Sequence, residues 1–562
     1  MNYINGLHFN NVRGDIYGGL TAAVVALPLA LAMGVASGAG PIAGIYGAIF
    51  VGFFAALFGG TPAQVSGPTG PMTVVMALIF TQYTSLFPGD PETGAALAFT
   101  VVMMGGILQI LFGVLRIGKY IEFVPHPVVS GFMSGIGVII ILIQIGPLLG
   151  LATSAKPLIV VQMMPEFFRN IHNPSLLLSL IVLAIVYGVP KFVPKLNKML
   201  PSPLLALVIG TLVYMLWMKD SGTPILGNIP TGFPSPQLPT IMLEHFPDMI
   251  LSALALAGLG TIDSLLTSLV ADNITRTHHK SDRELIGQGI GNTIAGIFGG
   301  LPGAGATMRT VVNVKAGGLT PISGALHALI LLVIVLGGGE LASNIPKAVL
   351  AGILVKVGTD IIDWDYLKRF NSAPKAGITI MLVVLLMTVF IDLLVAVGVG
   401  MIMASLIFMK RMSDLQMESA TAVNIPTEES PLNDHEKAIL TEAHGRILLY
   451  YMEGPLSFGA AKGMVRRLAH FKEYDSLVLD LTGVPSVDFT SSMALNDIIS
   501  DTLASKDRYV FLVGLRPNVK SFLDSQSILE QVDSGHIYAE RHTALCHAAR
   551  VINIDPDACK AD

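Results

Sequence analysis

Two stretches broken by glycine and proline are the strongest candidates for an ion-binding site, and they resemble each other. The first consists of Phe58–Pro62 and Gly67–Val75, and the second consists of Phe298–Pro302 and Gly303–Val312. Each has the pattern Phe-Gly-Gly-x-Pro, followed by small residues, Met, Thr and a pair of Val residues. Hydrophobic segments interrupted at matching places in two halves of a chain are typical of binding sites between the repeats of membrane transporters.

The residues after each break favour the binding of an anion. A helix that begins at membrane depth presents unpaired backbone N–H groups and the positive end of its dipole. Two such helices, one starting at Thr69 and the other at Ala306-Thr307, would form an anion site without any arginine. Glycines such as Gly70 and Gly305 would let a ligand approach the backbone closely. The alternative interpretation is that these glycines only permit helices to cross tightly.

Asp263 is an ionisable residue in the middle of an apolar span, which makes it a candidate functional group. Thr267 lies four residues further on and therefore on the same face of the predicted helix. Together with carbonyl oxygens of the break at Gly305 and Thr307, these two side chains would suit a small hard cation. The alternative interpretation is a carboxylate that is hydrogen-bonded inside the protein for structural reasons.

Arg309 is a second charge at membrane depth, one turn into the second half-helix. It could add positive charge to the anion site, or it could pair with Asp263 and neutralise it. These interpretations have different consequences, because a paired Asp263 has less reason to bind a cation, whereas an unpaired one favours a cation or a proton. The sequence leaves both open.

The composition identifies a polytopic membrane protein. Of 562 residues, 52% are hydrophobic and only 13% are charged, and the apolar runs repeatedly approach twenty residues, the length of a membrane-spanning helix. The 58 glycines lie largely inside these runs, as expected for helices packed closely in lipid. An enzyme is not indicated, because we find no nucleophile–base pair, no set of metal ligands and no phosphate-binding Gly-Lys-Ser/Thr motif.

We expect roughly fourteen spans within residues 1–412. Seven elements fall in each half, with the break after the second in each, which predicts two repeats of inverted topology. The segment Pro68–Phe80 is too short to cross alone and is expected to be a half-helix. A proline-rich connection, Gly227–Pro239, separates the halves.

The distribution of positive charge predicts the orientation. The loops on the side of both termini carry most of the Lys and Arg residues of the membrane region. The opposite loops carry only Lys156, Arg169, Lys219 and Lys347. The excess of positive charge predicts that both termini lie in the cytoplasm, without a cleavable signal peptide.

Residues 413–435 are polar and acidic and are expected to form a linker. Residues 436–562 then alternate between strand-like and helical patterns, which predicts a small α/β domain. Its strands are expected at Ile447–Tyr451, Ser476–Leu481 and Tyr509–Val513. The chain's two cysteines, Cys546 and Cys559, fall in this domain, and we expect them to be reduced and incidental.

These residues resemble the sulfate permease family of anion transporters over nearly the whole chain. Within it, the chain is most similar to the sodium-dependent bicarbonate transporters of cyanobacterial type. The runs that carry the likeness are Ser66–Val74, Thr261–Asp272, Gly287–Asn292 and Gly303–Val312. The C-terminal region is similar to the STAS domain that ends such transporters.

The resemblance implies a fold of fourteen spans in 7+7 inverted repeats, divided into core and gate subdomains and commonly dimeric. It implies bicarbonate held between the half-helices near Thr69, Ala306 and Thr307, and sodium held by Asp263, Thr267, Gly305 and Thr307.

Three positions depart from related proteins. Leu29 stands where many family members have glutamine. Arg309 stands where the bicarbonate branch has glycine, which weighs against sodium coupling more than against anion binding. In the STAS region, Phe489 occupies the phosphoacceptor position of related domains, so we expect no phosphorylation switch.

The sequence therefore favours a secondary active transporter that moves bicarbonate inward with sodium by an elevator-like motion. A proton-coupled sulfate or dicarboxylate permease, in which Asp263 titrates, is the main alternative. A passive anion channel, with Arg309 setting its selectivity, is a third.

Overall fold

The computed structural model describes residues 5–559 except 228–234, 238, 392, 429, 431, 469, 472 and 506. The chain forms two compact units, Met1–Ile402 and Met403–Asp562. The first is helical and the second contains a five-stranded sheet. Most of the expected connection between the halves, Gly227–Pro239, lies outside the described residues.

The first unit is built from apolar helices, as the composition predicts. Within the described residues, seven helices are long and apolar enough to cross a membrane. They are α1 (Val12–Ala36), α2 (Pro41–Phe58), α4 (Pro91–Val114), α5 (His126–Leu148), α7 (Asn173–Phe192), α10 (Phe246–Thr275) and α17 (Leu393–Ser419). Further helices complete each half: α3 (Gly70–Leu86) and α9 (Ser202–Val213) in the first, and α11 (Ser281–Ile297), α12 (Thr307–Lys315), α13 (Pro321–Ser343), α14 (Lys347–Ile361) and α16 (Lys375–Phe390) in the second.

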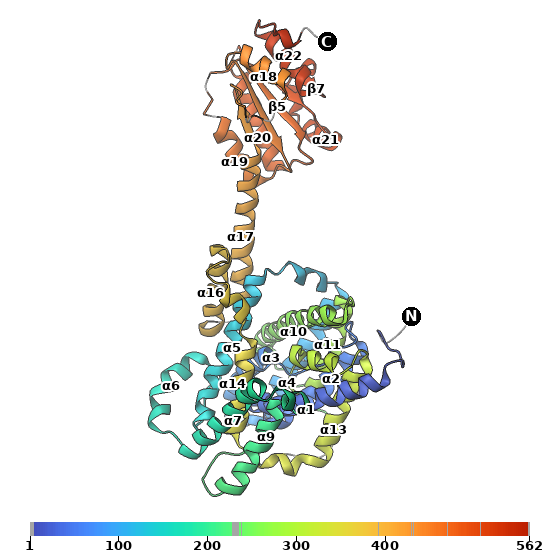
Figure 1. The fold of residues 1–562 in the computed structure, drawn as a ribbon, viewed down its shortest axis with the longest axis vertical. Helices are drawn as coiled ribbons and strands as arrows, with labels where there is room; N and C mark the ends of the chain where they lie inside the picture. Colours follow the sequence, from blue (N-terminus) through green and yellow to red (C-terminus); the bar gives the residue numbers. More distant parts are fainter. Residues whose placement is uncertain are drawn as a thin grey trace. The chain divides into compact units, whose positions relative to one another are not determined.

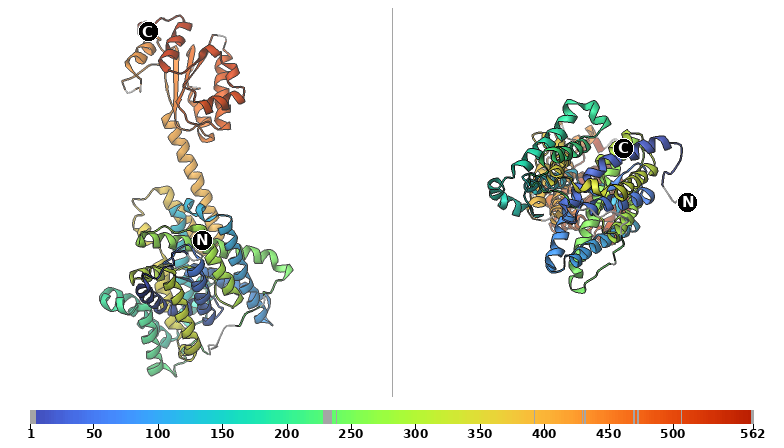
Figure 2. Two further views of the ribbon diagram at one scale, coloured as in Figure 1. Left: turned by 90° about the vertical axis from the view of Figure 1, so that its right-hand side faces the viewer. Right: turned by 90° about the horizontal axis from the view of Figure 1, so that it is seen from below.

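The helices of this unit pack in two groups, each of which draws on both halves of the chain. The first group combines α1–α4 with α10–α13, and the second combines α5, α7, α9, α14 and α16 with α6 (Pro157–Arg169). Figure 1 shows α5, α6, α7 and α14 on the left of the helical unit and α1, α2, α11 and α13 on its right; Figure 2 gives two further views. We call them the first and the second helix group.

Glycines allow the helices of the first group to approach each other closely. A Cβ atom on Gly289 of α11 would lie 2.6 Å from the carbonyl oxygen of Gly106 on α4. On the other side of α11, a Cβ atom on Gly287 would lie 2.3 Å from the backbone nitrogen of Gly59. Small residues at helix contacts are the usual means of close packing where lipid provides no hydrophobic drive.

The first half-helix is longer than expected. The sequence predicted that it ends near Phe80, but α3 continues to Leu86, so its 17 residues extend about 25 Å. The polar residues after Phe80 did not end it, because their hydroxyls bond back to the helix: Thr84 Oγ1 donates to the carbonyl of Phe80 at 2.7 Å. The second half-helix, α12, has only 9 residues.

The second unit is a layered α/β fold around one mixed sheet. Its strands are β3 (Thr421–Val423), β4 (Ile447–Glu453), β5 (Ser476–Gly483), β6 (Tyr509–Val513) and β7 (Ile537–Tyr538), adjacent in that order. All pairs are parallel except β3 with β4. One core packs against α19 (Phe458–Leu468), α20 (Phe489–Leu503) and α21 (Pro517–Ser525), and the other against α18 (Asp434–Glu442) and α22 (Arg541–Val551).

Two expectations about this unit are wrong in part. The expected linker, residues 413–435, is not all linker, because α17 continues to Ser419 and Thr421–Val423 forms the antiparallel edge strand β3. The cysteines are not separate thiols, because Cys546 and Cys559 form a disulfide with Cα atoms 5.7 Å apart. After α22 the chain reverses, and the short helix Asp557–Cys559 returns to it, which spacing alone could not show.

Candidate ion-binding site between the two helix breaks

The two breaks cross each other as a miniature antiparallel sheet. Strand β1 (Ser66–Gly67) pairs with β2 (Ala304–Gly305), with Ser66 opposite Gly305 and Gly67 opposite Ala304. The crossing is extended by a hydrogen bond of 2.9 Å from the Ala306 amide to the Val65 carbonyl. The matching motifs of the two halves are therefore in direct contact at the centre of the first helix group.

Close contact at this crossing explains several of the glycines. A Cβ atom on Gly303 would lie 2.5 Å from the carbonyl carbon of Gly67, a distance that real Cβ atoms essentially never show. A Cβ atom on Gly305 would lie 2.3 Å from Gln64 Nε2. Tight packing of protein against protein, the plainer of the two interpretations, therefore accounts for Gly303 and Gly305. Gly70 differs, because a Cβ atom there would meet only side-chain tips, those of Ile140 and Ile361 of the second helix group.

The half-helices begin directly after the crossing, and neither is capped by a side chain. Thr69 and Ala306 are the N-cap residues of α3 and α12, and neither side chain accepts a bond from the first turn. The first helical bonds are those from the Thr73 amide to the Thr69 carbonyl, 2.9 Å, and from the Thr310 amide to the Ala306 carbonyl, 2.8 Å. The N–H groups before them, including that of Thr307, have no intrahelical acceptor and suit an anion.

Helix α10 brings the expected cation-binding oxygens to the same place. Thr69 Oγ1 donates to Asp263 Oδ2 at 2.6 Å, which connects the start of α3 to the carboxylate. Thr267 Oγ1 lies 2.9 Å from the Gly305 carbonyl oxygen and 2.8 Å from Thr307 Oγ1. Asp263 is 6% exposed and Thr267 is fully buried. The structure thus joins the Thr267, Gly305 and Thr307 oxygens to one another, and it places Asp263, one turn earlier on α10, against Thr69.

Sequence reasoning missed a second polar row on α10. Ser264 Oγ accepts the Gly305 amide at 3.1 Å, and Ser268 Oγ lies 2.7 Å from Thr61 Oγ1 and 3.0 Å from Gln64 Oε1. The signal was present, because Ser264 and Ser268 repeat the spacing of four residues one position after Asp263 and Thr267. One row contacts the half-helix starts, and the other fastens α10 to both breaks.

Arg309 of α12 is buried next to the crossing. Its side chain is 1% exposed, and its Nη2 donates to the carbonyl of Pro68, just before α3 begins. Its Nη1 has no hydrogen-bond partner in the part of the chain that the structure describes, and a Cβ atom on Gly67 would lie 2.6 Å from it. Among the ion pairs of the described residues, none within 4.0 Å joins Arg309 to Asp263. The guanidinium thus places positive charge beside the start of the other half-helix.

Glu284 of α11 is a buried carboxylate that the sequence analysis did not single out. It is 1% exposed and accepts the backbone amides of Gly60 and Thr61 at 2.8 and 2.9 Å. It also accepts the side-chain amides of Gln64 and Gln288 at 2.8 and 2.7 Å. A residue from the second half of the chain therefore fixes the start of the first break.

The same face of α11 fastens the rest of the crossing. Gln288 Nε2 donates to Ser66 Oγ at 2.6 Å. Asn292 bonds both the amide and the carbonyl of Gly303, at 2.7 and 2.9 Å. Glu284, Gln288 and Asn292 are spaced by four, and this polar row along one face of α11 was the signal that could have identified them.

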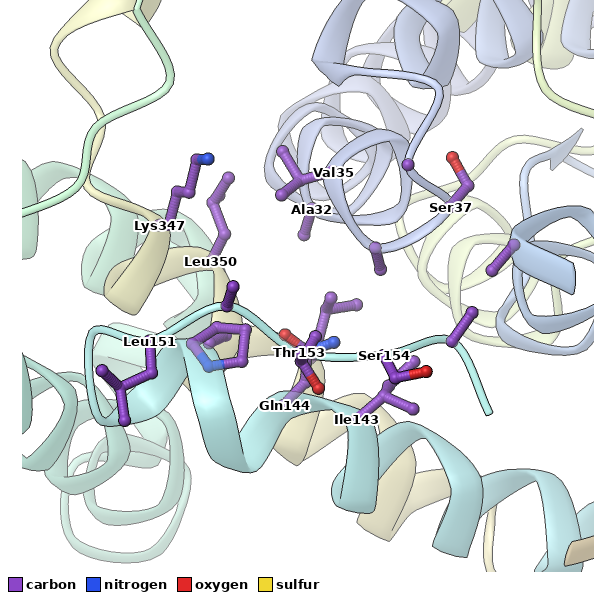
Figure 3. Close-up of a pocket in the computed structure, with 18 of the residues that line it drawn as sticks. Ala32, Val35, Ser37, Ile143, Gln144, Leu151, Thr153, Ser154, Lys347 and Leu350 are labelled. Atoms are coloured by element: carbon purple, nitrogen blue, oxygen red, sulfur yellow. The ribbon is translucent and has the colours of Figure 1, made fainter. Parts of the chain in front are cut away.

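A cavity of about 440 Å³ opens between the two helix groups. It reaches α3 at Ala77 and Thr81, about 10 Å along the helix from its start. Figure 3 shows Lys347 of α14 across from Ala32 and Val35 of α1. All the lining residues are described, and Lys347 is the one charged residue among them. We call this cavity the vestibule; it does not include the half-helix starts themselves.

The STAS-like unit places Phe489 at the first position of α20, with its side chain 61% exposed. The N-cap residue Asp488 accepts the Ser491 amide at 2.7 Å. A phenylalanine has no hydroxyl to phosphorylate, so the expectation that this position does not serve as a phosphoacceptor follows from its chemistry.

Comparison with known proteins agrees with these features. Residues 12–384 match the model of the sulfate permease family, and residues 438–544 match that of the STAS domain. The chain is 45% identical to the bicarbonate transporter BicA of Synechocystis over 97% of this chain and 96% of that protein. It is 46% identical to the BicA of Picosynechococcus over 99% and 98%.

The helical unit is also similar to a solved structure. The transmembrane domain of a cyanobacterial bicarbonate transporter BicA superimposes with a TM-score of 0.65 at 48% identity, over 71% of this chain and 100% of that one.

Proposed function

Because the chain belongs to the sulfate permease family and is an anion transporter rather than an enzyme, we propose that it takes up bicarbonate together with sodium. One observation carries the proposal: two uncapped helix starts, at Thr69 and at Ala306, meet at a crossing that also holds the oxygens of Asp263 and Thr267. The near full-length similarity to transporters named for bicarbonate supports this substrate.

In the proposed mechanism the anion binds to the N–H groups of the first turns of α3 and α12, near Thr69, Gly70, Ala306 and Thr307. The dipoles of both helices stabilise its charge without a direct ion pair. Arg309 adds positive potential through its contact with the Pro68 carbonyl. Bicarbonate both donates and accepts hydrogen bonds, so the Thr307 hydroxyl, which lies on an exposed residue, is a suitable partner.

The proposed sodium site consists of Asp263, Thr267, and the carbonyl and hydroxyl oxygens of Gly305 and Thr307. Hard cations prefer such oxygen ligands, and unwound backbone between half-helices is where transporters bind sodium. The Thr267–Gly305 and Thr267–Thr307 contacts hold three of these oxygens together. A bound cation would reduce the electrostatic cost of the buried carboxylate and raise the affinity for an anion next to it.

The proposed movement is elevator-like. The first helix group, which holds the whole crossing, would slide against the second. The contact between Gly70 and the tips of Ile140 and Ile361 supports this, because flexible apolar tips make no specific bond across the boundary. We also propose that both termini lie in the cytoplasm and that the protein is a homodimer in the inner membrane.

A proton-coupled sulfate or dicarboxylate permease is the second candidate. It is favoured by the surroundings of Asp263, whose hydrogen-bond partner is the neutral hydroxyl of Thr69 and which has no ion pair among the described residues. Such a carboxylate could carry a proton instead of compensating a cation.

Uptake of radiolabelled bicarbonate and sulfate into proteoliposomes separates these functions. We expect bicarbonate uptake driven by an inward sodium gradient, and a loss of at least about tenfold in Asp263→Asn, because the proposed sodium site loses its carboxylate charge. Asp248→Asn, at an exposed position in the first turn of the same helix, is the matched control and should retain uptake. Uptake driven by a pH gradient but indifferent to sodium would favour the proton-coupled permease. Uptake that never exceeds equilibrium would indicate a channel.

A further inference from the structure

The disulfide in the STAS-like unit joins two segments that other contacts already hold together. Cys546 lies on α22, and Cys559 lies 13 residues later on a short helix. The chain reverses at Asn553, which has a left-handed backbone with φ of 61°. Arg550 Nη2 donates to the carbonyl of Cys559 at 3.1 Å, and both cysteines belong to the core between α22 and the sheet. The two sulfurs would therefore stay neighbours in the reduced protein.

The two cysteines also line a cavity of about 330 Å³ with a basic character. His542, His547 and Arg550 contribute to its wall, and no described Asp or Glu does; Arg550 also lies 3.9 Å from Asp555, in an ion pair whose two side chains are more than half exposed. His542 Nε2 lies 3.7 Å from Cys546 Sγ, close enough for the imidazole to take the thiol proton. A thiolate is the reactive form of cysteine, and neighbouring cationic or basic groups favour it.

We propose that Cys546 and Cys559 are a redox-active dithiol that exchanges with an anionic low-molecular-weight disulfide received in this cavity. The Cys546 thiolate attacks one sulfur of the small disulfide, forming a mixed disulfide and releasing one thiol. Cys559 then loses its proton and attacks Cys546, which closes the protein disulfide and releases the second thiol. Two protein thiols are oxidised and one small disulfide is reduced to two thiols, so electrons and protons balance.

Thiol–disulfide exchange is the role that best fits the Cys546–Cys559 pair in the proposed cytoplasmic location. On the proposed cytoplasmic side, thiols are kept reduced, and a disulfide that forms there is usually transient or redox-sensing. The inference uses this placement but no property of transport. Oxidation would tie the chain after α22 to that helix covalently, whereas in the reduced protein hydrogen bonds such as those from Arg550 to Cys559 and from Asp557 to Glu442, together with core packing, would hold it.

Thiol labelling of the full-length protein in nanodiscs tests the proposal. The protein is equilibrated with defined mixtures of reduced and oxidised glutathione, alkylated, and analysed by peptide mass. We expect alkylation of both cysteines to fall together as oxidised glutathione rises, and to recover fully in excess reduced glutathione. In Cys559→Ser, Cys546 should instead accumulate the glutathione adduct. Cysteines that remain fully alkylated at the highest proportion of oxidised glutathione would overturn the proposal, as would cysteines that resist excess reductant.

The cavity's part is tested by rates. Oxidised glutathione should react at least about fivefold faster than neutral bis(2-hydroxyethyl) disulfide, and the preference should fall in Arg550→Gln and in high salt. His542→Ala should slow both reagents by about tenfold at neutral pH. Equal rates for the two disulfides in the wild-type protein would overturn recognition by the cavity. These measurements follow thiols and not uptake, so they succeed or fail independently of the proposed transport function.

Discussion

The two helix breaks have the same backbone arrangement, a short strand followed by an uncapped helix start, but they differ in their side chains. In the first, α3 has 17 residues, none of them charged, and contributes one hydroxyl, that of Thr69, to the site. In the second, α12 has 9 residues and carries Arg309, while the neighbouring α10 and α11 supply Asp263 and Glu284. The repeat of the fold thus provides two helix starts, and the second half provides nearly all of the charge.

The largest effect is expected where the shared backbone is broken. Gly303→Ala would place a Cβ atom 2.5 Å from the backbone of Gly67, and neither chain can move without separating β1 from β2. We expect destabilisation of at least about 3 kcal/mol and little folded protein, measured by thermal unfolding in detergent. Gly258→Ala is the matched control, because nothing lies within 4 Å of its added atom. Normal folding of Gly303→Ala would contradict the tight crossing.

An intermediate effect is expected where the second half fastens the first break. Each carboxylate oxygen of Glu284 accepts two of four N–H donors, and Glu284→Gln would replace one of these oxygens by an NH2 group whose hydrogens face two donors. We expect a loss of about 2 kcal/mol in stability, seen as a lower melting temperature. Glu244→Gln, at an exposed position, should leave the melting temperature unchanged. An unchanged melting temperature in Glu284→Gln would mean that the first break is held by its own half.

The smallest effect is expected in the vestibule, where Lys347 of the second half supplies the charge. Lys347→Gln should raise KM for the anion about two- to fivefold with little change in kcat, because a distant charge attracts the ligand without binding it in the site. The difference should shrink at high salt. Lys219→Gln, also exposed but outside the vestibule, is the control. A fall in kcat at unchanged KM would assign Lys347 to a different step.

The sequence predicted those parts of the site that depend on residues close together in the chain. The Gly-Gly-x-Pro motifs identify both breaks, and the spacing of four between Asp263 and Thr267 identifies one face of α10. The pairing of β1 with β2 could not be predicted, because its register depends on contacts between residues in opposite halves. Glu284 was not predicted as a site residue because it lies in the first turn of α11, next to charged residues of the preceding segment.

Two errors have a common cause. The sequence predicts a half-helix over Pro68–Phe80, whereas α3 continues to Leu86 because a hydroxyl after Phe80 bonds within the helix. The cytoplasmic placement of Cys546 and Cys559 predicts reduced thiols, whereas a reversal of the chain brings them together in a disulfide. In both cases the outcome depended on hydrogen bonds or chain direction, which residue types alone do not show.

The crossing of β1 and β2 also bears on the electrical behaviour of the proposed transporter. Thr69 at the start of α3 is hydrogen-bonded to Asp263, and Thr307 at the start of α12 is hydrogen-bonded to Thr267. The proposed anion and cation sites would therefore move as one rigid body, and both ions would cross together. One sodium ion and one bicarbonate ion carry no net charge. The cargo itself would therefore add no charge to the movement. Any dependence of uptake on membrane voltage would come from the fixed charges of that body, which include the buried Glu284 as well as Asp263 and Arg309.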